Sequence, residues 1–332
     1  MLLYVIIGII SLIVILVSCE LFTNAIEWTG KKLGLHHGIT GSILAAVGTA
    51  LPETLIPIIA VLFIPGKVGE DIGIGAILGA PFMLSTLAFG LAGLAAIFYH
   101  FRKKRPLELN VNDRVLSNDL LFFVVVFVLA IGFSFLPASV KRPASGVFLV
   151  IYGLYIYRTF QQEAPESEGD ILKPLYFHRL STPDLKAALF QDLVALAGII
   201  MAARFFVKSI EHLAAAWGVE PLVFSLFIAP IATELPEKFN SIMWIRRQKD
   251  TLALGNISGA MVFQSSVVVF VGVVCTNWIL TRQAIFSAVV ALASTLLVFA
   301  HMKIHKRLMP QVLLSGLLFY ILYVVLTLRY NL

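Results

Sequence analysis

A proline followed by a glutamate stands in the middle of two long apolar segments of this sequence. Pro52-Glu53 lies in segment 38–63, and Pro236-Glu237 lies in segment 222–245. Proline removes a backbone hydrogen bond from a helix. A carboxylate inside a membrane span is costly and usually faces a cavity or an ion path. Two such pairs at matching places predict one functional site, built by both halves of the chain.

The composition requires a membrane around most of the chain. Of its 332 residues, 59% are hydrophobic and 13% are charged, which is about half the charge of an average soluble domain. Apolar segments of about 20 residues cross a bilayer as helices, so we predict an all-α polytopic membrane protein. The net charge of +6 indicates no nucleic-acid partner, because the basic residues are confined to short loops.

Ten apolar segments are predicted to be transmembrane helices. They cover residues 2–28, 38–63, 72–99, 116–137, 144–159, 187–214, 222–245, 252–279, 283–301 and 309–328. With the N-terminus outside, most basic loop residues lie on the inner side. Because positively charged loops stay in the cytoplasm, we predict an integral protein of the cell membrane with both termini outside.

The polar segment 161–185 divides the chain into two halves, 1–160 and 186–332. Its acidic, proline and glycine content is typical of a linker, and the predicted topology places it in the cytoplasm. The halves resemble each other, since Pro52-Glu53 matches Pro236-Glu237 and the segment from Gly75 to Gly79 matches that from Gly255 to Gly259. Because five spans is an odd number, the second half enters the membrane from the opposite side. We therefore predict two inverted-topology five-helix repeats, with a binding site near the midplane between them.

The two proline-glutamate segments offer oxygen ligands. We expect each proline to break its helix and to free carbonyl groups near residues 47–49 and 231–233. The Thr49 and Thr233 hydroxyls and the Glu53 and Glu237 carboxylates add further oxygens. Such a set suits Ca²⁺, which takes six to eight oxygen ligands, whereas zinc or copper would require His or Cys. The alternatives are structural roles for the glutamates and hydrogen bonds from the threonines to their own helices.

The two segments resemble the alpha repeats of the sodium/calcium exchanger family, in the calcium/cation antiporter superfamily. GTALPE at 48–53, followed by Gly75–Gly79, is similar to the first repeat, and ATELPE at 232–237, followed by Gly255–Gly259, is similar to the second. The resemblance implies a secondary antiporter that exports Ca²⁺ by alternating access, with the first and sixth helices sliding over the rest. The ligands it carries over are Thr49, Glu53, Thr233 and Glu237.

The chain departs from the family pattern where exchangers hold sodium. The third span has Ala76, Ala80 and Pro81 at positions where the family has polar residues, while the eighth span keeps Asn256 and has Gln264. Na⁺ and H⁺ therefore both stay open as the counter-ion. Asn256 is a candidate ligand, with a hydrogen bond between helices as its alternative.

New charges accompany the second motif. Glu234 replaces a serine of the family pattern, and Lys238 follows it at the spacing that lets the two side chains meet. We take Glu234 as a further ligand and Lys238 and Gln264 as coupling candidates, because an ammonium group competes with a cation for the same oxygens. The alternative for Lys238 is a stem that extends toward the membrane surface.

Other charged residues lie in the first and sixth spans. Glu20 and Arg204 occupy equivalent repeat positions with opposite signs, and both a pairing and a place near a span end stay open. We expect solvated places near span ends for Glu27, Asp192, Lys208 and Glu211.

The predicted function is exchange of Ca²⁺ or another hard divalent cation for H⁺ or Na⁺. The predicted partners are inorganic cations and the bilayer, and neither an enzymatic activity nor a bound cofactor is expected. The alternatives are an exchanger that moves only monovalent cations and a cation channel, although nothing in the sequence resembles a filter loop of backbone carbonyls.

Overall fold

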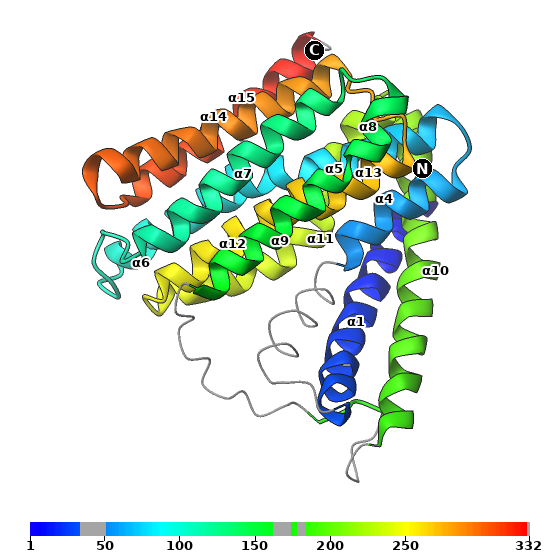
Figure 1. Ribbon diagram of the computed structural model, residues 1–332, viewed down its shortest axis with the longest axis horizontal. Helices are drawn as coiled ribbons and strands as arrows, with labels where there is room; N and C mark the ends of the chain where they lie inside the picture. Colours follow the sequence, from blue (N-terminus) through cyan, green and yellow to red (C-terminus); the bar gives the residue numbers. More distant parts are fainter. Residues whose placement is uncertain (34–50, 162–173, 178–183, 331–332) are drawn as a thin grey trace.

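The structure is a computed structural model that describes residues 1–33, 51–161, 174–177 and 184–330 (Figure 1). The first half contains α1 (Leu2–Lys32), α4 (Leu51–Phe63), α5 (Lys67–Met83), the π-helical η2 (Leu84–Ala88), α6 (Phe89–Phe101), α7 (Asp113–Phe133), α8 (Ala138–Ala144) and α9 (Gly146–Gln161). The second half contains α10 (Leu185–Trp217), α11 (Pro221–Arg246), α12 (Asp250–Phe263), the π-helical η3 (Gln264–Val268), α13 (Val269–Cys275), α14 (Arg282–His305) and α15 (Pro310–Tyr330).

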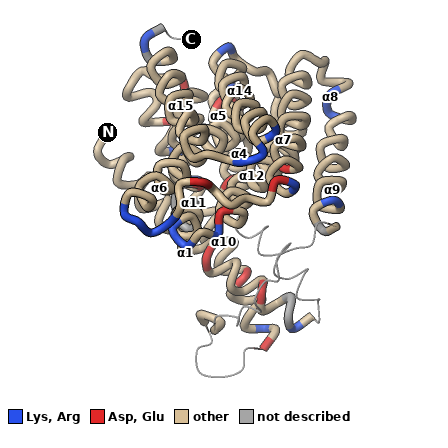
Figure 2. Tube along the Cα trace, turned by 90° about the vertical axis from the view of Figure 1, so that its left-hand side faces the viewer, with Lys and Arg blue, Asp and Glu red and all other residues tan. Residues whose placement is uncertain are grey.

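Seven helical segments of the described residues are long and apolar enough to cross a membrane. Long stretches of the chain in Figure 2 carry neither acidic nor basic residues. The prediction of an all-α membrane protein is therefore confirmed. The number of ten spans stays a prediction, because α4 and the apolar part of α11 are shorter and residues 34–50 lie outside the described ranges.

The helices α1 and α10 lie side by side, apart from most of the bundle (Figure 1). Near one end Gly8 faces Ser209, and further along Gly198 lies so close to Ser18 that a Cβ would meet the serine hydroxyl. At the other end Thr29 donates a hydrogen bond to Asp192 over 2.8 Å. These contacts show that α1 and α10 run antiparallel and approach closely where their side chains are small.

The helix α11 is continuous, so the predicted break at 231–233 is wrong. A proline inside a helix removes one hydrogen bond and bends the helix, and neighbouring groups can compensate for that loss within a membrane protein. The break was expected from Pro236, and the same helix also contains Pro230, which leaves the Leu226 carbonyl without its helical donor. Gly79 of α5 packs directly on this carbonyl. The carbonyls predicted near residues 47–49 lie outside the described residues.

Two long helices contain a π-helical turn at the same relative position. η2 separates α5 from α6, and η3 separates α12 from α13, 180 residues later. In each turn a side-chain hydroxyl donates to the carbonyl four residues earlier, from Thr86 to Phe82 and from Ser266 to Val262. Single π turns re-aim the side chains around them and are frequent at functional sites.

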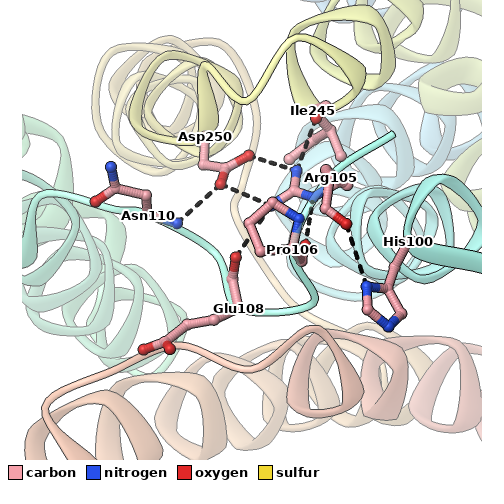
Figure 3. Close-up of polar contacts among 7 residues, drawn as sticks. All are labelled: His100, Arg105, Pro106, Glu108, Asn110, Ile245 and Asp250. Atoms are coloured by element: carbon pink, nitrogen blue, oxygen red, sulfur yellow. Dashed lines mark hydrogen bonds and ion pairs between the residues drawn. The ribbon is translucent and has the colours of Figure 1, made fainter. Parts of the chain in front are cut away.

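A buried ion pair connects the α6–α7 loop to the turn between α11 and α12 (Figure 3). The Arg105 guanidinium donates to both carboxylate oxygens of Asp250, over 2.7 and 2.8 Å, and to the Ile245 carbonyl over 2.7 Å. The Asn110 backbone N–H donates to the same carboxylate over 2.8 Å. One arginine therefore closes the end of α11 and holds the first turn of α12.

We expect Asp250→Asn to lower the free energy of unfolding by about 3–5 kcal/mol, because it leaves the Arg105 charge buried without its partner. Unfolding by heat or denaturant in detergent measures the effect. Adding Arg105→Met should recover part of the loss, since the double variant buries no charge at this place. Equal stability of wild type and Asp250→Asn would contradict the structural role of the pair.

Candidate functional site

Glu53 lies in a small cavity between α4, α5 and α11. Its side chain is 7% exposed and belongs to the first turn of α4. The wall is formed by Ile56 and Pro57 of α4, Ala76 and Ala80 of α5, and Ala229, Pro230 and Thr233 of α11. A carboxylate that lines a cavity between apolar helices is a candidate for an ion site.

The cavity brings together two of the predicted ligands, Glu53 from the first half and Thr233 from the second. The Thr233 hydroxyl donates to the Ala229 carbonyl over 3.1 Å, as the alternative interpretation of this residue anticipated. A hydroxyl that donates in this way keeps its lone pairs for a cation. The geometry of Thr233 is therefore compatible with both a ligand of a cation and a hydrogen bond within its own helix.

Small residues of α5 form the wall opposite α11. A Cβ at Gly75 or Gly79 would collide with the carbonyls of Leu222 or Leu226, so the two helix backbones are in direct contact. Ser225 strengthens the contact by donating to the Ile72 carbonyl over 2.8 Å. Because α5 and α11 are so close, the cavity is narrow.

Glu234 and Gln264 form a second buried polar pair. The Gln264 amide N–H donates to the Glu234 carboxylate over 2.9 Å, and both side chains are 2% exposed. Gln264 is the first residue of η3, so the π turn directs its amide toward α11. Among the described residues nothing donates a hydrogen bond to its amide oxygen. The structure thus brings together a predicted ligand and a predicted coupling residue.

In the part of the chain that the structure describes, the remaining predicted ligands and coupling residues are not seen at the Glu53 cavity or at the pair of Glu234 and Gln264. Asn256 donates to the Ser241 hydroxyl over 3.2 Å, which is the helix-packing contact given as its alternative. Thr49 lies outside the described residues, and so do the side chains of Glu237 and Lys238 on α11. Within the described part, no group of three His, Cys, Asp or Glu side chains could hold a metal ion.

Among the charged residues of the first and sixth spans, Asp192 differs from expectation. Asp192, expected in solvent, is 9% exposed and accepts a hydrogen bond from Thr29, because α1 covers that face of α10. Glu20 accepts a hydrogen bond from the Tyr176 hydroxyl over 2.9 Å. The Arg204 guanidinium lies 3.6 Å from the centre of the Phe63 ring.

Sequence reasoning missed Asp119, a carboxylate of α7 that is 3% exposed. It accepts hydrogen bonds from Ser258 of α12 over 2.6 Å and from Tyr155 of α9 over 3.1 Å. Ser258 belongs to the segment between Gly255 and Gly259, so Asp119 holds the helix that carries the second glycine motif. The signal that could have found it is a single acidic residue in a predicted span.

One protein family matches both halves of the chain. The family model described as "Sodium/calcium exchanger protein" matches residues 3–161 and 188–329. Inner membrane protein YrbG of Escherichia coli (strain K12) is 25% identical over 264 residues, which are 78% of this chain and 76% of that protein.

Solved structures of exchangers have a similar fold. The H⁺/Ca²⁺ exchanger CAX aligns with a TM-score of 0.74 at 19% identity, over 98% of this chain and 82% of that one. The sodium-calcium exchanger NCX_Mj, soaked with Na⁺ and Sr²⁺, aligns with a TM-score of 0.58 at 19% identity, over 98% of both chains. At this identity the likeness concerns the fold.

We expect Asp119→Ala to lower the free energy of unfolding by about 2–4 kcal/mol, because two buried hydroxyls lose their acceptor. Asp113→Ala is the matched control, since Asp113 lies on the same helix but is half-buried in its first turn. Chemical denaturation in detergent compares the two variants. Equal losses would show that the Asp119 contacts do not hold α12.

Proposed function

Because the chain belongs to the sodium/calcium exchanger protein family, which consists of cation antiporters, we propose that it exchanges Ca²⁺ or another hard divalent cation for protons. The observation that carries this proposal is the Glu53 carboxylate on the wall of a narrow cavity, with Thr233 of the other half on the same wall. The cation is the cargo of this site.

The oxygen chemistry supports a hard divalent cation. The Glu53 carboxylate and the Thr233 hydroxyl are oxygen donors, and the wall contains no sulfur or imidazole group among the described residues. Ca²⁺ prefers such ligands and accepts an irregular cage. We propose Glu237 and Thr49 as the ligands that complete the site, because they stand at the repeat positions of Glu53 and Thr233.

The lining of the cavity favours protons over sodium as the counter-ion. Ala76 and Ala80 form the wall that faces α11, and methyl groups cannot bind Na⁺. Glu234 supplies an additional carboxylate, buried beside Gln264, and a buried carboxylate can carry a proton in one half of a transport cycle. Of the two exchangers of similar fold, CAX exchanges protons for Ca²⁺ and NCX_Mj exchanges sodium for calcium. Because these two exchangers share the fold but use different counter-ions, the fold does not decide between them. The proposal of protons depends on Ala76, Ala80 and Glu234 of this chain.

For the architecture we propose ten spans in two inverted repeats, with both termini outside the cell membrane and a cytoplasmic linker at 161–185. The antiparallel course of α1 and α10 supports this arrangement, and so do the two π turns 180 residues apart. Alternating access then consists of α1 and α10 sliding against the bundle. Their close contact through Gly8 and Gly198 supports a movement of the two helices as a pair.

We expect Glu53→Gln to abolish Ca²⁺ flux in proteoliposomes, because the amide keeps the shape of the side chain and removes its charge. Glu108→Gln is the matched control, since Glu108 is an exposed glutamate of the α6–α7 loop, and its flux should equal that of wild type. Both variants should insert and purify normally. Normal flux through Glu53→Gln would overturn the proposed site.

The counter-ion is tested by imposing Ca²⁺, Na⁺ and pH gradients one at a time. We expect Ca²⁺ uptake to follow the pH gradient and to ignore sodium in the wild type. In Glu234→Gln, Ca²⁺ movement should lose most of its dependence on pH, because the buried carboxylate no longer exchanges a proton. Uptake that needs sodium would support a Na⁺-coupled exchanger, and Ca²⁺ flow with no counter-ion would support a channel.

A further inference from the structure

A cleft of about 210 Å³ lies between the end of α4 and the adjoining face of α10. Its walls are apolar, formed by Ile59, Phe63, Ile64 and Val207 among others, and Arg204 and Lys208 stand on the α10 side. The two basic residues are one helical turn apart, so both charges are on the same face of α10. This cleft is separate from the Glu53 cavity, and its charge has the opposite sign.

The cleft lies level with an apolar stretch of α1. Gly8 contacts Ser209 and Ser18 contacts Gly198, so Arg204 lies beside the part of α1 between residues 8 and 18. This part carries no charged residue, and side chains such as Ile13, 54% exposed, point away from the protein. This flank of the cleft is therefore apolar and suited to contact lipid acyl chains.

Within the described protein no carboxylate forms an ion pair with the basic residues of the cleft, although Glu211 lies at its rim. The ion pair between Arg105 and Asp250 is the one that the described residues form, so neither Arg204 nor Lys208 is paired there. Arg204 is exposed and stacks on Phe63, which shields only one face of the guanidinium. Two cations beside apolar walls favour binding of an anion, and basic pockets between spans bind lipid headgroups.

We propose that this cleft binds the phosphate group of an anionic phospholipid. Arg204 and Lys208 contribute two positive charges and Glu211 at the rim one negative charge, which leaves one positive charge for one phosphodiester. The guanidinium edge donates to the phosphate oxygens, while the apolar walls take the glycerol and the start of an acyl chain. An uncharged headgroup such as glycerol fits better than an amine, which the two cations would repel.

The test measures retention of phosphatidylglycerol and phosphatidylcholine on the full chain by native mass spectrometry. Wild type should retain phosphatidylglycerol preferentially, and Arg204→Gln with Lys208→Gln should weaken its binding about 30-fold, from about one kcal/mol per basic residue. Arg102→Gln is the matched control, because Arg102 is also exposed and stacks on a phenylalanine, Phe98. It should bind as wild type does.

Glu211→Gln makes the cleft more positive without removing a group that binds the phosphate, so it tests whether positive charge strengthens lipid binding. We expect it to tighten phosphatidylglycerol binding about fivefold, because it removes the negative charge from the rim. Equal binding of the two lipids by wild type would overturn the proposal, and so would unchanged retention in the double variant. Displacement of phosphatidylglycerol by millimolar inorganic phosphate would assign the cleft to a free anion instead of a lipid.

Discussion

Direct backbone contact between α5 and α11 is the constraint on which the candidate site depends. Gly75 and Gly79 leave no room for a side chain against the carbonyls of Leu222 and Leu226. Small residues allow such contact between membrane helices, where no hydrophobic force drives them together. A Cβ at either glycine would displace α11, and Thr233 with it, from the Glu53 cavity. The glycines therefore act on the site without touching a cation.

The polar groups of the interior divide into two kinds. Arg105 with Asp250, and Asp119 with Ser258 and Tyr155, satisfy each other and join helices. A buried group of this kind is costly to remove because its partner stays behind. Glu53 instead lies on the wall of a cavity, which in the proposed function holds the transported cation. This difference in surroundings, and not burial alone, separates the candidate site from the scaffold.

Much of the general picture could be predicted from the sequence, because it depends on repeated patterns. The apolar segments predicted the helical membrane protein, and the two proline-glutamate motifs predicted the family that the family model confirms. The pairing of Glu234 with Gln264 depends on the η3 turn, for which no sequence pattern was recognised. Asp119 was missed since it has no counterpart in the repeat, and the expected break in α11 was wrong because neighbouring groups tolerate a proline in a packed helix.

Polar residues are distributed unevenly between the halves, and this has a consequence for the proposed inverted repeat. At matching positions the first half has Ala50, Ala76, Leu78 and Leu84, and the second has Glu234, Asn256, Ser258 and Gln264. Two identical inverted halves would give inward- and outward-facing states of equal free energy, because exchanging the halves exchanges the states. Here the polar side chains at these matching positions, including the carboxylate of Glu234, belong to one half. For the proposed inverted repeat, the two states are then expected to differ in free energy.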